Sequence, residues 1–174
     1  MLEKSGMRFG SNLALLPLAA LVALAGAAGG CPAATPVGPA CNDYAPPAGF
    51  DALSPAVSFS KDVLPIFARS CGFSTCHGST TGPANGVFLG RDGPRVYSAI
   101  VGTKGDELPA LAFITPGNPR ESYLMRKMDG SQCALDAQCS GATCQSSMPK
   151  GEGPLEVGTR DIVRRWIAQG AKND

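Results

Sequence analysis

The ten residues Ser70–Ser79, SCGFSTCHGS, contain two of the seven cysteines of the chain and its only histidine. His77 directly follows Cys76, and four residues separate Cys76 from Cys71. Thiols near an imidazole allow three chemistries: a disulfide beside an unrelated polar histidine, a zinc site, or covalent attachment of a cofactor. The choice among them decides how the remainder of the chain folds.

The order of the three side chains favours covalent attachment. The compact signature of c-type haem is C-x-x-C-H, in which two thiols bond to the porphyrin and the next residue is held beneath the iron. Here the spacer has four residues instead of two. Because the order of the two cysteines and the histidine is the same, we still predict one haem c, attached through Cys71 and Cys76, with His77 as an axial ligand of the iron.

A second axial ligand is expected downstream, in SSMPKGEGP. The iron of an electron carrier often takes a methionine sulfur opposite its histidine. Pro149 disfavours helix at Met148, which places Met148 on a loop that can turn its sulfur inward. We predict His77 and Met148 as the two iron ligands, whereas Met125 and Met128 are expected to be core residues.

The segments around these residues predict helices joined by long loops. No stretch alternates at period two, so the expected fold class is all-α. Capping residues and turn formers mark the ends of four helices. Their expected caps and stops are Asp62 and Cys71, Asp92 and Gly102, Asn118 and Gly130, and Thr159 and Gly170, with Trp166 in the core.

The first thirty residues resemble an export signal. An uncharged run from Leu13 to Cys31 follows Lys4 and Arg8, and three small residues stand directly before Cys31. This layout predicts a lipoprotein-type signal peptide at 1–30 and lipidation of Cys31. A plain secretory peptide cut nearby is the alternative. Either way the protein is exported, and the lipid anchor would place it in a bacterial cell envelope, facing the periplasm or the outer surface.

Proline and alanine dominate residues 31–56, which are predicted to be a tether between the anchor and a domain at 57–172. Cys41 lies in this segment and hints that part of it is attached to the domain. Net charge is close to zero once the signal is removed, so nucleic-acid binding is not expected. Aromatic residues make up only 6% of the chain, and a core this poor in them needs disulfides, a metal or a buried cofactor.

Six stretches of the chain, taken in order, resemble the planctomycete-type cytochrome c domain, a small relative of class I cytochromes c. They are DVLPIFARSC, CHGS, GVFLG, ITPGNPRESYL, MPKG and IVRRWIAQGA. The resemblance covers nearly all of the predicted domain. It implies an all-α cytochrome c-like fold whose first and last helices cross beside the haem. It also implies that Cys71 and Cys76 attach the haem and that His77 and Met148 bind its iron.

Four further cysteines, Cys41, Cys133, Cys139 and Cys144, are disulfide candidates. Four thiols allow three pairings, and we favour Cys133 with Cys144, which would staple the loop before Met148. A zinc site made by these cysteines and His77 is less expected in an oxidising compartment.

The predicted function is electron transfer in the cell envelope, with redox proteins as partners and no substrate turnover. One alternative is a haemless, disulfide-stapled lipoprotein module for binding or attachment, with both Cys71 and Cys76 in disulfides. Another is a peroxidase-like enzyme, in which the position opposite His77 would be open.

Overall fold

A computed structural model describes residues 41–174, and these residues are helical with long connecting loops. The predicted signal peptide, Cys31 and the first part of the tether lie outside the described residues. Within 41–174 there is no strand, only two isolated bridges between 101–104 and 112–114, which agrees with the all-α prediction. The α-helices are α1 (Leu64–Ser70), α2 (Gly93–Ile100), α3 (Tyr123–Asp129) and α4 (Val157–Ala168). Shorter helical turns are η1 (Phe59–Val63), η2 (Ala84–Gly86), η3 (Pro119–Glu121), η4 (Gln132–Gln138) and η5 (Ser140–Ala142).

The first helical run starts four residues earlier than its sequence signal indicates. Ser58 caps η1, because its hydroxyl accepts the N–H of Lys61 at 3.4 Å. Asp62, the predicted cap, lies in the first turn, and its carboxylate accepts the N–H of Ser58 at 2.8 Å. The Ser58 and Asp62 side chains thus satisfy the N–H groups of Lys61 and Ser58, in an arrangement similar to a capping box.

The predicted caps of the next two helices are found. Asp92 accepts the N–H of Arg95 at 3.2 Å before α2, and Asn118 accepts the N–H of Glu121 at 3.2 Å. The helix predicted between Asn118 and Gly130 is nevertheless interrupted at Ser122, whose hydroxyl donates to the carbonyl of Asn118 at 2.8 Å. This bond separates η3 from α3. Gly130 then ends α3 with φ of 71°, a left-handed conformation that glycine adopts at little cost.

The last helix begins at Val157, so the prediction that Thr159 caps it is wrong. Thr159 lies within its first turn, and no side chain caps the helix at Glu156. Trp166 is fully buried, and its ring stacks on Phe59 with centroids 5.3 Å apart. The indole N–H donates to the carbonyl of Lys172 at 2.9 Å. Trp166 is therefore a core residue, as predicted.

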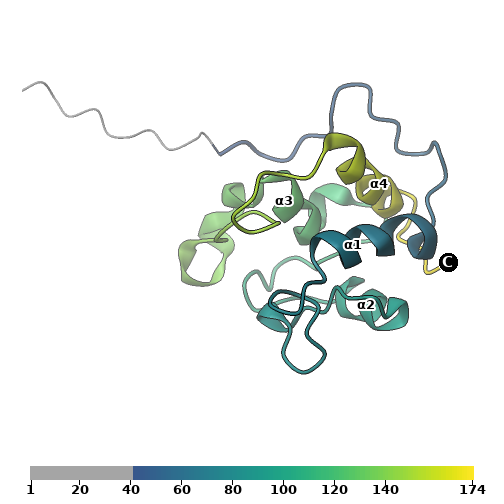
Figure 1. Cartoon of the computed structure of the whole chain (residues 1–174). Coiled ribbons are helices and arrows are strands. Elements are labelled where there is room, and N and C mark those ends of the chain that lie inside the picture. The colour runs from purple at the N-terminus through teal and green to yellow at the C-terminus, as the bar shows by residue number, and fades with distance from the viewer. Residues whose placement is uncertain (1–40) are drawn as a thin grey trace, which may run out of the picture. The chain divides into compact units, whose positions relative to one another are not determined.

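The C-terminal end of the chain lies against the start of η1. Figure 1 shows α4 next to the helical run that continues into α1, with the C-terminal residues at the start of that run. The N–H groups of Phe59 and Ser60 donate to the side chain and the carbonyl of Asp174, both at 2.9 Å. First-turn N–H groups have no partner inside their own helix, so Asp174 satisfies two of them.

Residues 41–56, part of the predicted tether, are attached to the helical domain. A disulfide joins Cys41 to Cys133, and Tyr44 is only 7% exposed. Further along, the Gln169 side chain donates to the carbonyls of Ala52, Leu53 and Pro55. This segment therefore contributes to the core and does not extend freely from it.

The predicted pairing of Cys133 with Cys144 is wrong. The disulfides of the described residues are Cys41–Cys133 and Cys139–Cys144, so all four candidate cysteines are bonded, but to other partners. The reason is local. The short turn η5 folds the chain back between Cys139 and Cys144, which leaves Cys133 to bond with the N-terminal segment.

Candidate cofactor site

A cavity of about 770 Å³ opens between the loop after α1, the wall formed by α3 and the loop before α4. This volume lies within the range of small-molecule and cofactor pockets, roughly 300–1,000 Å³. Apolar side chains make up much of its wall. They include Val87, Leu89, Phe113, Leu124, Met128 and Leu155.

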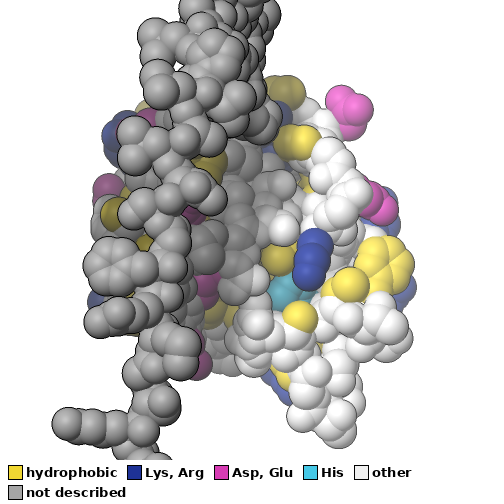
Figure 2. All heavy atoms as spheres, turned by 90° about the vertical axis from the view of Figure 1, so that its left-hand side faces the viewer, with side chains coloured by type: hydrophobic (Ala, Val, Ile, Leu, Met, Phe, Trp, Pro, Cys, Tyr) yellow, Lys and Arg dark blue, Asp and Glu magenta, His cyan; other side chains and the backbone are white. Residues whose placement is uncertain are grey.

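The structure places Cys71, Cys76, His77 and Met148 on the wall of this one cavity. Met148 is separated from His77 by 70 residues of sequence, so folding alone brings the two together. Figure 2 shows the histidine in cyan at the surface of this side of the molecule, beside hydrophobic side chains and a Lys or Arg side chain.

The four-residue spacer folds into a closed turn. The N–H of His77 donates to the carbonyl of Cys71 at 3.1 Å, and the N–H of Cys76 donates to Phe73 at 2.9 Å. A Cβ atom at Gly78 would lie 2.0 Å from the carbonyl oxygen of Gly72, so only glycine fits where the turn closes. The longer spacer thus still brings Cys71 next to the Cys76–His77 pair.

The imidazole of His77 is oriented by the GVFLG segment. Its Nδ1 atom lies 3.0 Å from the carbonyl oxygen of Val87, and its own carbonyl accepts the N–H of Leu89 at 2.8 Å. A carbonyl oxygen can only accept, so the bond requires the proton on Nδ1 and leaves the lone pair of Nε2 free. Metal-binding histidines commonly have this arrangement, in which a backbone carbonyl fixes the ring.

The two thiols of the motif differ in environment. Cys71 and Cys76 are the free cysteines of the described chain, and Cys76 is the exposed one. Burial, with a smaller contribution from the neighbouring Cys76, raises the pKa of the Cys71 thiol to about 11. Neither cysteine is in a disulfide, so both are available for bond formation, and the raised pKa keeps Cys71 as a neutral thiol at physiological pH. Within residues 41–174, Cys, His, Asp and Glu form no group of three or more that could hold an ion such as zinc.

Met148 reaches the cavity from the loop before α4. Its backbone N–H donates to the carbonyl of Lys127 on α3 at 2.9 Å, which ties the loop to the cavity wall. Met125 is fully buried, as expected for a core residue. Met128 is also buried but lines the cavity, so a second thioether lies on the wall.

Three polar side chains on the same wall were not identified from the sequence. Tyr123 donates its hydroxyl to Glu107 at 2.8 Å, and the ammonium of Lys127 lies 2.9 Å from the same carboxylate oxygen. Burial, and then the hydrogen bond to Glu107, raises the pKa of Tyr123 far above its usual range. Tyr123 and Lys127 share a helix face at i and i+4, but nothing local in the sequence connects either to Glu107.

Comparisons with known proteins do not assign the chain to a family. No protein-family model, no curated protein and no solved structure matches the chain. Over residues 41–174, none of the helices has both the length and the apolar character needed to span a bilayer. The case for a function therefore rests on the geometry of the cavity and its side chains.

Proposed function

We propose that this chain is a small cytochrome c-like protein that binds one covalent haem c and carries single electrons in the cell envelope. The observation that carries the proposal is the convergence of Cys71, Cys76, His77 and Met148 on one cavity of about 770 Å³. Two thiols, one imidazole and one thioether are the functional groups that such a site requires.

The residues present fit the group. Each thiol would add across one of the two vinyl double bonds of the porphyrin, with its sulfur bonding to one carbon and its hydrogen going to the other. Cys71 and Cys76 are both free for this reaction. The bond between His77 Nδ1 and Val87 leaves Nε2 available as an iron ligand, and Met148 supplies a thioether from another part of the cavity wall.

The polypeptide would act by orienting ligands and excluding water. A bound haem supplies a one-electron Fe(III)/Fe(II) couple, and a thioether ligand tends to raise its potential. Val87 holds the His77 ring in one orientation, and the apolar wall lowers the access of water. No step of this function requires a nucleophile or a general base.

Export and anchoring belong to the same proposal. Lipidation of Cys31 would hold the domain at a membrane surface, where redox proteins of the envelope would exchange electrons with it. A tryptic peptide of the purified protein that begins with acylated Cys31 would support this part. An unmodified N-terminus beginning at another residue would support the plain secretory alternative.

The test is a denatured mass spectrum of the chain produced in cells with a working c-type maturation system. The expected mass exceeds that of the polypeptide by one haem, because thioether bonds survive unfolding. Cys71→Ser and Cys76→Ser should each remove one thioether bond, and the double variant should carry no covalent haem. Cys139→Ser with Cys144→Ser is the matched control and should still carry it.

A wild-type mass without haem from such cells would contradict the proposal and leave the haemless module. That alternative expected Cys71 and Cys76 in disulfides, whereas both are free in the structure. In the haem-loaded protein, a spectrum unchanged by Met148→Ala would instead show that Met148 is not a ligand, as the peroxidase-like alternative requires.

A further inference from the structure

Lys127 carries a buried ammonium group on the wall of the cavity. Its side chain is 9% exposed, and Glu107 lies 2.9 Å from it as the neutralising carboxylate. The ammonium also donates to the carbonyl of Ser146 at 3.1 Å and to the carbonyl of Cys144. A lysine ammonium has three N–H donors, so all three have partners here.

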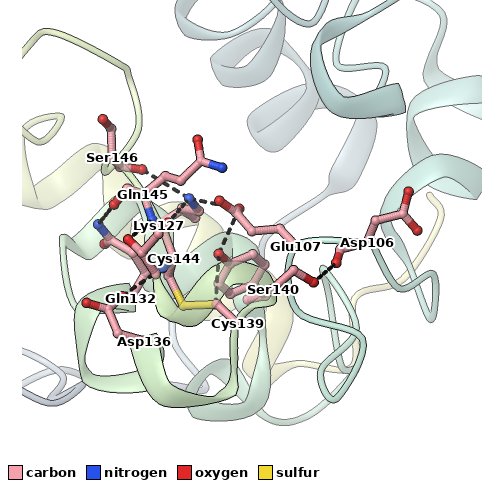
Figure 3. Close-up of a disulfide and its surroundings, with 12 residues drawn as sticks. Asp106, Glu107, Lys127, Gln132, Asp136, Cys139, Ser140, Cys144, Gln145 and Ser146 are labelled. Carbon is pink, nitrogen blue, oxygen red and sulfur yellow. Dashed lines mark hydrogen bonds and ion pairs between the residues drawn. A yellow bond between two sulfur atoms is a disulfide. The ribbon is translucent and has the colours of Figure 1, made fainter. Parts of the chain in front are cut away.

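Two of the three partners of the Lys127 ammonium lie on the loop that leads to Met148. The side chain of Lys127 contacts the carbonyls on either side of Gln145, and its main-chain carbonyl accepts the N–H of Met148 at 2.9 Å. Figure 3 shows Lys127 between Glu107 and the backbone of Cys144–Ser146, close to the Cys139–Cys144 disulfide. One residue of α3 thus holds the loop at three points.

The loop is also held at Cys144, by the disulfide to Cys139 and by the N–H of Cys144, which donates to the Asp136 carboxylate at 2.7 Å, but these contacts act four residues before Met148. Gln145 and Ser146 are exposed, so they provide no apolar anchor. The Gln132 side chain donates to the carbonyl of Gln145 at 3.1 Å, which is a neutral bond and weaker than those of an ammonium. An ammonium buried without partners is costly, so Lys127 and the loop carbonyls stabilise each other.

From these contacts we propose that Lys127, held by Glu107, is the positioning residue that brings Met148 to the iron. The inference rests on the proposed function, since it assigns to Lys127 the role of holding one axial ligand in place. Glu107 fixes the ammonium from the side opposite the loop. The carbonyls of Cys144 and Ser146 then fix the loop two to four residues before Met148.

The test compares Lys127→Met with Lys61→Met in the full chain, made with the c-type maturation system. Lys127→Met keeps the backbone carbonyl and a side chain of similar length but removes the ammonium. Lys61 is exposed on η1, away from the cavity, and provides the same exchange as a control. Two properties are measured: the thioether-to-ferric-iron charge-transfer absorption, and the hydrogen-exchange rate of the Met148 amide.

Lys127→Met should retain covalent haem but lose most of the charge-transfer absorption. The Met148 amide should exchange about tenfold faster or more, the range expected for loss of hydrogen bonds to a charged group. Lys61→Met should leave both readings at the wild-type level. A Lys127→Met protein with the full absorption and an unchanged exchange rate would overturn the proposal.

A second variant covers the case in which Lys127→Met does not fold. Glu107→Gln preserves an acceptor for Lys127 and Tyr123 but removes the charge, and it should raise the Met148 exchange rate by roughly threefold or more. An unchanged rate in Glu107→Gln would overturn the proposal. Hydrogen exchange can also be measured in protein without haem, so wild-type protein without haem would contradict the proposed function, while the exchange rates of the variants would still test whether Lys127 holds the Met148 loop.

Discussion

Replacing Cys41 and Cys133 together by alanine should destabilise the protein more than replacing Cys139 and Cys144 together. The two residues lie 92 positions apart, against 5 for Cys139 and Cys144. In the chain-entropy treatment, these loop lengths correspond to about 4.6 and about 2 kcal/mol of free energy of unfolding at 25 °C. The disulfide that closes the long loop lowers the conformational entropy of the unfolded chain more than the disulfide that closes the short one.

Burial works in the opposite direction but is too small to reverse the order. Cys139 and Cys144 are 6% and 0% exposed, whereas Cys41 is exposed. If each buried sulfur is counted like a methylene group, removing both costs about 1.6 kcal/mol beyond the loop effect. The short disulfide then contributes about 3.6 kcal/mol, which is still about 1 kcal/mol less than the long one.

Urea unfolding of the two double-alanine variants, followed by far-ultraviolet circular dichroism, measures this difference. All proteins must be compared in the same state of cofactor loading, since bound ligands stabilise the folded chain. A loss below about 2 kcal/mol for the Cys41/Cys133 variant would refute the reasoning. So would a larger loss in the Cys139/Cys144 variant, because the loop-length argument permits neither result.

Three further predictions concern the core and the charges. Trp166→Ala should cost about 3–5 kcal/mol in urea unfolding, because it empties a fully buried site beside Phe59, and Trp166→Phe should cost less. Asp129→Asn should cost about 1–3 kcal/mol in the same assay, since the guanidinium of Arg164, which is 1% exposed, keeps only Asp161 as a carboxylate partner and Arg160 loses its own; a loss below about 0.5 kcal/mol would contradict this. The hydrogen bond from Arg126, and then the one from the backbone N–H of Tyr44, lower the pKa of Asp43. The stability that ionised Asp43 contributes is present above the pKa that its carboxyl has in the unfolded chain, and it is lost as pH falls through the lower pKa of the folded state. Wild type should therefore lose more stability than Asp43→Asn between about pH 5 and pH 2. Equal losses would argue against the pairing of Asp43 with Arg126.

The ends of the helices show how far local signals reach. Asp92, Asn118, Gly130 and Gly170 act as predicted, because a cap or a left-handed glycine acts within its own turn. The start at Asp62 was wrong. Asp174, more than a hundred residues away, supplies partners to N–H groups of an earlier turn, and no local pattern contains that contact.

The helix predicted between Asn118 and Gly130 is not continuous in the structure, for a related reason. Ser122 has a buried side chain that bonds both to Asn118 and to the N–H of Thr115. Its hydroxyl competes with the helical pattern of backbone bonds, as serine does when it can bond locally. The sequence contains the serine, but only the packing of the loop at 115 shows that it breaks the helix.

Within the candidate site, neighbouring residues were predictable and distant pairs were not. The motif from Cys71 to His77 is a local arrangement, and Pro149 marked the Met148 loop. These residues lie on one cavity wall in the structure, and their part in binding haem stays a prediction. The sequence did not determine the disulfide partners or the bond from His77 to Val87.

By itself the sequence determined the helical class and most helix ends, and it selected the cysteine, histidine and methionine side chains that lie on the cavity wall, since these follow from spacing and from residue type. The tertiary structure alone decided that Cys133 bonds with Cys41 and that Glu107 neutralises Lys127 behind the Met148 loop. The physical reason is distance along the chain: a disulfide or an ion pair depends on positions in space, and many different folds could bring the same distant residues together or keep them apart.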